Sequence, residues 1–142
     1  MKISSEKTAF LDSSVLFTAV NSPIGGSSKL FILQIKLITS KVVLTEVERN
    51  VRNKLDSYHL DRFFMLVNQL TILNQIPDEK IISEAKKLIA EKDAVILAEA
   101  KQAKSDFLVT LDQKHFFTKE AEKFLQPKRI VTPKMLIELL ET

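Results

Sequence analysis

Short apolar runs alternate along the chain with longer segments in which apolar residues recur every three or four positions. Short apolar runs bounded by polar residues are typical of buried strands, and the three- or four-residue spacing is typical of amphipathic helices. The short runs predict strands at residues 8–11, 37–40, 106–112 and 129–133. The longer segments predict helices at residues 13–19, 28–36, 41–55, 60–70, 79–90 and 134–140, with a further helix that Asp93 caps and that ends near residue 103.

Strands that alternate with helices favour a parallel sheet with helices on both faces. The predicted fold class is therefore α/β, a three-layer α/β/α sandwich around a central, mainly parallel sheet. At 142 residues the chain is expected to form one domain, residues 1–142. In such sheets ligands bind beyond the carboxyl ends of the strands, where the strand order reverses.

The composition excludes some classes of chemistry but does not identify the function. The chain has no cysteine, which excludes disulfides, thiolate metal ligands and cysteine nucleophiles. A net charge of +3 fits an anionic partner without requiring one. No apolar run is long enough to span a membrane, and the first ten residues lack the apolar segment of a signal peptide. We therefore expect a cytoplasmic protein with no membrane partner.

Two of the predicted strands end on an aspartate, Asp12 and Asp112. In a parallel sheet both carboxylates emerge at the same edge, and a helix that begins near Asp93 can start on that side as well. Clustered carboxylates repel one another unless they share a proton or bind a cation. Oxygen ligands without cysteine or a histidine cluster favour Mg²⁺ or Mn²⁺ over zinc.

Each of these acids also has an ordinary structural interpretation. Asp93 is a common type of helix cap, and Asp112 can begin a turn after its strand. Asp12 is harder to explain in this way, because it follows an apolar strand directly. The three together favour a metal site.

Five segments in order resemble the PIN-domain nucleases, which include VapC-like toxin ribonucleases. They are FLDSSVLFTAV, TSKVVLTEVERNV, DAVILAEA, DFLVTLDQKHF and RIVTPKMLIELL, and they span nearly the whole chain. The resemblance implies an endoribonuclease that uses Mg²⁺ or Mn²⁺ and cleaves phosphodiester bonds of RNA. It also implies the toxin role in a toxin–antitoxin pair, with a small antitoxin protein and a second copy of the chain as candidate partners.

The resemblance assigns the catalytic acids to Asp12, Glu46, Asp93 and Asp112, with Asp12, Asp93 and Asp112 as the metal ligands. Glu46 fits because an apolar residue stands three before it and one after it. On a helix, however, Glu46 lies nearly opposite the apolar stripe that runs from Leu44 to Leu55, so a solvated glutamate is the alternative.

Two positions depart from the family pattern. Ser14 stands where the family often has asparagine, and a hydroxyl offers one donor where an amide offers two. His115 stands where many members have another aspartate, so it is either a substrate contact or an exposed histidine at a helix start. Thr110 matches a frequent hydroxyl of the family and is expected to orient Asp112 or a water.

Two other functions compete with the ribonuclease. One is a catalytically weak PIN-like module that binds RNA or protein, because Ser14 and His115 replace the usual residues. The other is a phospho-acceptor receiver domain, which the chain fits poorly because no acidic pair precedes the first long helix.

Two surface features carry weaker signals. The sequence GGSSK at residues 25–29 lacks Walker A spacing, so it is either a glycine turn that meets a phosphate or a flexible turn beside the cleft. Phe63, Phe64 and Leu66 form a candidate exposed apolar patch for a homodimer.

Overall fold

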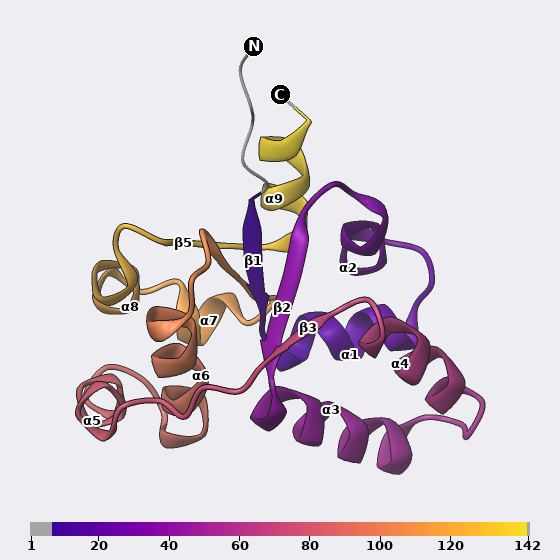
Figure 1. Cartoon of the computed structure of the whole chain (residues 1–142), viewed down its shortest axis with the longest axis horizontal. Coiled ribbons are helices and arrows are strands. Elements are labelled where there is room, and N and C mark those ends of the chain that lie inside the picture. Colours follow the sequence, from indigo (N-terminus) through magenta and orange to yellow (C-terminus); the bar gives the residue numbers. More distant parts are fainter. Residues whose placement is uncertain (1–6, 142) are drawn as a thin grey trace.

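The computed structural model describes residues 7–141 of the chain, and its centre is a five-stranded parallel sheet. The strands stand in the order β3-β2-β1-β4-β5 (Figure 1). Their bounds are β1 Thr8–Leu11, β2 Lys36–Ser40, β3 Thr71–Leu73, β4 Phe107–Val109 and β5 Arg129–Val131. All neighbouring strands are parallel, so their carboxyl ends lie at one edge.

The strand order reverses at β1, the central strand. Ala9 is paired with Leu37 of β2 on one side and with Phe107 of β4 on the other. The backbone N–H of Asp12 continues this pairing, because it donates to the carbonyl of Val109 at 3.0 Å. Asp12 therefore stands at the topological switch point, where open α/β sheets bind their ligands.

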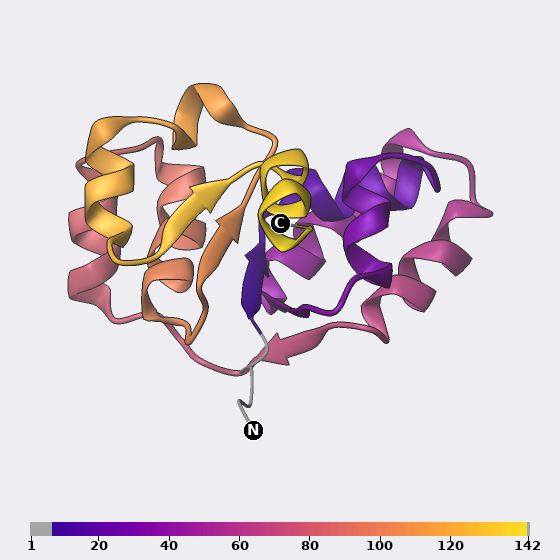
Figure 2. The same cartoon turned by 90° about the horizontal axis from the view of Figure 1, so that it is seen from above.

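Helices fill the connections between the strands. Their bounds are α1 Ser13–Asn21, α2 Gly26–Lys29, the 3₁₀ helix η1 Leu30–Ile32, α3 Lys41–Lys54, α4 His59–Val67, α5 Glu79–Lys86, α6 Glu91–Gln102, α7 Gln113–Phe116, α8 Lys119–Leu125 and α9 Pro133–Leu140. Figure 2 shows α9 in front of the sheet, with α1 to α4 on one side and α5 to α8 on the other.

Alternating side chains of the strands separate two apolar layers. Phe10 of β1 packs into the larger layer, with buried residues of α1, α3, α4, α5, α6 and α8. Ala9 and Leu11 point to the opposite face and pack with Leu30 of η1 and Leu136 of α9. The predicted three-layer α/β/α sandwich is confirmed, and its central strands β1 and β4 are largely buried because helices cover both faces.

The structure differs from several of the predicted elements. Residues 28–36 do not form one helix: α2 and η1 end at Ile32, and Lys36 joins the sheet beside β1. Strand β3, which was not predicted, is short and only partly buried, so it lacks the apolar signal of the other strands. Helix α5 ends at Lys86, before the predicted residue 90.

The predicted apolar patch on α4 also needs correction. Phe63 and Leu66 are each only 2% exposed and belong to the core, whereas Phe64 is exposed. Among residues 7–141, no helix has both the length and the apolar character needed to cross a membrane.

Candidate active site

Asp12 stands between the end of β1 and the start of α1 and is only 4% exposed. Its Oδ2 accepts two hydrogen bonds, from Thr110 Oγ1 at 2.7 Å and from Ser14 Oγ at 2.8 Å. Burial raises the pKa of the Asp12 carboxyl above its ordinary value, these two hydrogen bonds oppose the rise, and the nearby Glu46 carboxylate adds to it. The hydroxyls thus supply part of the solvation that the carboxylate loses on burial.

Ser14 and Thr110 also hold the loop that follows β4. Ser14 Oγ accepts from the backbone N–H of Leu111 at 3.0 Å, and Thr110 Oγ1 accepts from the N–H of Asp112 at 3.0 Å. Each hydroxyl therefore connects Asp12 to the segment that carries Asp112. Thr110 was predicted to orient Asp112 or a water; it contacts the Asp112 backbone and the Asp12 side chain.

Asp93 lies in the first turn of α6 and is 8% exposed. It is not the predicted helix cap, because α6 begins at Glu91 and Ala90 occupies the cap position. Within residues 7–141, its Oδ2 is buried without a hydrogen-bond partner. Burial raises the pKa of the Asp93 carboxyl, Lys92 lowers it, and the charges of Asp12 and Asp112 raise it further.

Asp112 caps α7 and binds His115 at the same time. Its Oδ1 accepts from the backbone N–H of His115 at 3.2 Å. The His115 Nδ1 lies 3.0 Å from Oδ1 and 2.8 Å from Oδ2. The His115 side chain is half-exposed, and it contacts the Asp112 carboxylate. It is therefore not simply an exposed histidine at a helix start.

Asp93, Asp112 and His115 form a group whose potential ligand atoms all lie within 4.8 Å of one another. Carboxylate oxygens with a buried atom that lacks a partner suit a divalent cation, which would neutralise the like charges. Asp12 is outside this group, although its charge acts on Asp93. The assignment of Asp12 as a metal ligand stays a prediction.

Glu46 approaches the site from α3 and accepts a hydrogen bond from Ser13 Oγ at 2.5 Å. The fully buried stripe of α3 is formed by Val43, Val47 and Val51, and the predicted Leu44 and Leu55 pack half-buried against the same core. Glu46 adjoins that stripe and is half-buried, so it is not a fully solvated glutamate. Consecutive serines, Ser13 and Ser14, thus contact two of the four predicted acids.

A third buried carboxyl, Glu99, was not predicted. It lies two turns after the start of α6, is 7% exposed, and accepts from Ser40 Oγ at 2.7 Å. Ser40 in turn caps α3 by accepting from the N–H of Val43 at 3.2 Å. Burial raises the pKa of the Glu99 carboxyl, and the Ser40 hydrogen bond opposes this rise. The apolar surroundings of Glu99 in the sequence gave only a weak signal.

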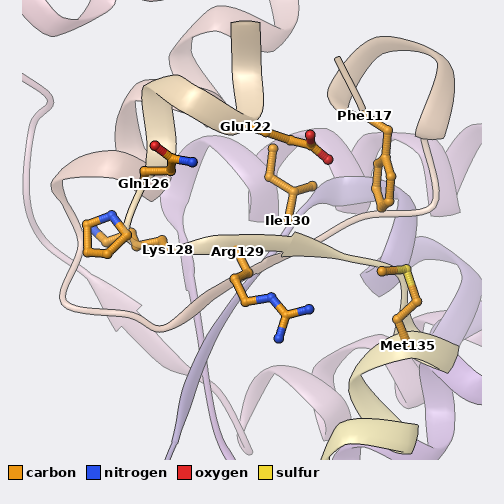
Figure 3. Close-up of a pocket in the computed structure, with 8 residues that line it drawn as sticks. Phe117, Glu122, Gln126, Lys128, Arg129, Ile130 and Met135 are labelled. Carbon is orange, nitrogen blue, oxygen red and sulfur yellow. The ribbon is translucent and has the colours of Figure 1, made fainter. Parts of the chain in front are cut away.

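A hollow of about 780 Å³ lies away from these acids, along β5 (Figure 3). Figure 3 shows Ile130 and Arg129 on β5, with Phe117, Glu122 and Met135 around them. None of the residues that line it is a predicted site residue.

The fold and the site define an α/β protein with an acidic group, able to hold a divalent cation, at the switch point of a parallel sheet. The family model of the PIN domain matches residues 9–123, and the chain belongs to this family. PIN domains are typically nucleases that depend on divalent metal ions, so membership supports a nuclease.

Solved structures show the same fold at low sequence identity. The crystal structure of DNA-bound VapBC from Salmonella typhimurium matches with a TM-score of 0.69 and 14% identity, over 91% of this chain and 99% of that chain. The crystal structure of PAE2754 from Pyrobaculum aerophilum matches with a TM-score of 0.64 and 14% identity, over 95% of this chain and 90% of that chain. No curated protein sequence matches the chain significantly.

Proposed function

We propose that the protein is a metal-dependent endoribonuclease that cleaves phosphodiester bonds of RNA. The observation that carries the proposal is the buried Oδ2 of Asp93, which has no hydrogen-bond partner in the described part of the chain and belongs to a group with Asp112 and His115. A buried carboxylate oxygen without a partner is costly, and a bound cation removes that cost.

In this proposal Asp12, Asp93 and Asp112 hold Mg²⁺ or Mn²⁺ and Glu46 completes the acidic site. When bound, the ion would offset charge on the phosphoryl group and activate a water. Ser14 and Thr110 keep the Asp12 carboxylate oriented, since both donate to its Oδ2. Ser13 does the same for Glu46.

The partners and the cellular setting belong to the proposal as well. The similarity to a VapBC structure supports a toxin with a small antitoxin protein. We also propose a homodimer, a cytoplasmic location and one domain over residues 1–142.

The test compares wild type, Asp12→Asn and Asp56→Asn on single-stranded RNA and on DNA of the same sequence. Asp56 is an exposed aspartate outside the site and serves as the matched control. Cleavage of RNA by wild type and Asp56→Asn in Mg²⁺ or Mn²⁺, lost in EDTA and in Asp12→Asn, supports the proposal. Equal cleavage by all three proteins identifies a contaminant, and cleavage of DNA alone contradicts the choice of RNA.

A second candidate is the catalytically weak PIN-like module that binds RNA or protein. The contact of His115 Nδ1 with both oxygens of Asp112 favours it, because that carboxylate is already occupied. RNA binding without cleavage in any divalent cation would identify this module.

A further inference from the structure

A second hollow, of about 350 Å³, lies next to the acids, between α1, α2, the loop before α7 and the start of α9. Its volume is within the range of small-molecule sites in proteins. Leu111, which lines it, directly precedes Asp112, and its N–H donates to Ser14 Oγ. The hollow therefore adjoins the acidic site at Leu111.

Helix α1 continues the polar surface from the acids into this hollow. Ser14 and Thr18 are four residues apart, which places them on one face of the helix, and Ser22 follows as the residue that caps its C-terminal end. Ser14 contacts Asp12, whereas Thr18 and Ser22 line the hollow.

Hydroxyl groups in the lining can form hydrogen bonds with a polar ligand. Ser27 and Thr132 both line the hollow and are 5% and 9% exposed. The Oγ1 of Thr132 accepts from the N–H of Met135 at 3.1 Å, and a hydroxyl that accepts a hydrogen bond can still donate one. The hollow therefore offers hydrogen-bonding groups from α2 and from the start of α9.

The charge of the hollow is opposite to that of the neighbouring acids. Among residues 7–141, the lining contains Lys134 as its charged residue and no aspartate or glutamate. Apolar contact surface comes from Ile24 and Leu111, which are 84% and 41% exposed. A cation, hydroxyl groups and apolar surface together suit a nucleotide, which has a phosphate, a sugar and a base.

We propose that this hollow binds one nucleotide of the RNA strand, adjacent to the phosphate that is cleaved. The inference rests on the proposed ribonuclease function and adds a subsite to it. Lys134 contacts the flanking phosphate, Ser27, Thr18 and Thr132 bind the sugar and the base edge, and Leu111 contacts the base face.

The test measures binding of a fluorescein-labelled single-stranded RNA dodecamer by fluorescence anisotropy in EDTA, so that no cleavage interferes. The variants are Lys134→Ala, Ser27→Ala and Thr18→Val, and the control is Lys87→Ala, an exposed lysine at the end of α5. Circular dichroism melts establish that each variant is folded, and Thr18→Val, which also removes one hydroxyl from the lining, tests the hydroxyl contribution independently of Ser27→Ala.

Lys134→Ala is expected to weaken binding about tenfold and to lower the slope of log K against log salt by about 0.7, as loss of one phosphate contact with a single strand does. Ser27→Ala is expected to weaken binding about threefold to tenfold without a change of slope, because it removes one neutral hydrogen bond. Lys87→Ala should match wild type in both quantities. In a cleavage assay Lys134→Ala should raise KM and leave kcat unchanged, the signature of lost uniform binding.

Wild-type affinity in all the pocket variants overturns the inference, as does an equal loss in Lys87→Ala. The proposed function fails independently: wild type that binds RNA in EDTA but does not cleave it with Mg²⁺ or Mn²⁺ contradicts the nuclease and leaves the subsite in place.

Discussion

The Asp93 carboxyl is buried in surroundings that are unfavourable for its charged form. Its Oδ2 is buried without a partner among the residues that the structure describes, and the charges of Asp12 and Asp112 act on the carboxyl in addition to burial. An unsatisfied buried carboxylate lowers the free energy of unfolding by about 1–3 kcal/mol or more. Selection for stability alone would therefore not produce this arrangement. Such local costs are common at functional sites, where a ligand later satisfies the group.

Replacement of this charge should separate stability from activity. Asp93→Asn is expected to lower metal-dependent cleavage by about 100-fold, the size of effect typical when one electrostatic group is removed at a reaction centre. In EDTA at neutral pH its thermal midpoint should be equal to or above that of wild type, because a neutral amide relieves the repulsion. Cleavage assays and circular dichroism melts measure the two effects, with Asp56→Asn as the control. A variant that melts well below wild type would instead indicate a structural role for the carboxylate.

His115 is the residue at which this chain departs most clearly from the family pattern. Its Nδ1 contacts both oxygens of Asp112, so a cation at Asp112 competes with it or shares the carboxylate. His115→Asp adds a hard oxygen ligand and removes that contact. It is expected to lower the Mn²⁺ concentration needed for half-maximal cleavage by about tenfold.

The control for this substitution is Lys114→Gln, which makes the same change of net charge on the neighbouring exposed residue of α7. An equal effect of the two substitutions would show that net charge, and not ligation, controls metal affinity.

At the scale of elements, hydrogen bonds near the middle and at the end of α6 hold the helix in place, and they thereby position Asp93 at its start. Near its middle, Glu99 accepts from Ser40 at the end of β2. At its end, Lys128 Nζ donates to the carbonyls of Lys101 and Ala103. The ammonium group thus satisfies carbonyls at the end of the helix that have no partner within it. Burial lowers the pKa of the Lys128 ammonium group, and nearby Lys101 lowers it further.

Ser40 has two structural roles, so its loss should cost more than that of an ordinary helix cap. Ser40→Ala removes the cap of α3 and leaves the buried Glu99 without its donor. We expect a loss of unfolding free energy of about 2–4 kcal/mol, the sum of a cap and an unsatisfied buried group. Thr118→Ala removes only the cap of α8 and should cost about 1 kcal/mol. Urea denaturation measures both, and equal losses would mean that Glu99 finds another partner.

Glu99 should also make stability depend on pH. Its pKa is raised in the folded protein, so the folded state binds more protons than the unfolded state between the ordinary pKa of 4.5 and the raised value. The free energy of unfolding therefore falls as the pH rises through this window. Glu99→Gln removes this loss and keeps an acceptor for Ser40.

The variant should thus melt above wild type at neutral pH, and the difference should shrink as the pH falls toward the ordinary pKa. Thermal melts of both proteins over this range measure the effect. A difference in melting temperature that does not change with pH would contradict it.

The sequence predicted the elements whose signals are local. Strand β1 was predicted with its observed bounds, Thr8–Leu11. The short apolar run directly before Asp12 is a local signal that marks the end of the strand. Residues 28–36 carry apolar spacing of a helix, yet pairing of Lys36 with Thr8 draws the segment into the sheet. Such pairing depends on residues distant in the sequence, so periodicity could not show it.

The site was predictable to the same degree. Asp12 and Asp112 follow from two strands that end at one edge, and Asp93 follows from a helix expected to start on that side, whereas Glu46 is assigned through the family resemblance. The hydrogen bond between Ser13 and Glu46, and the contact of His115 with Asp112, depend on side-chain rotamers and could not be derived from spacing. The catalytic roles of all four acids stay predictions.

For the whole molecule, the acids come from four separate parts of the chain: the end of β1, α3, the start of α6 and the loop after β4. They meet only when the sheet is complete, because β1 must pair with both β2 and β4. The unfolded chain therefore offers no comparable site, and a cation that binds the folded protein must stabilise the whole fold.

This coupling gives a test of metal binding that does not depend on catalysis. Addition of Mn²⁺ to a 100-fold excess over its Kd should raise the free energy of unfolding of wild type by about 2.7 kcal/mol, and the thermal midpoint should rise with Mn²⁺ concentration. NaCl at the same ionic strength should give no comparable rise, since screening alone does not fill the site. Asp93→Asn should show little response to Mn²⁺, because the oxygen that lacks a partner has been replaced. An equal response of wild type and Asp93→Asn would locate the bound cation elsewhere on the molecule and remove the main support for a metal at the switch point.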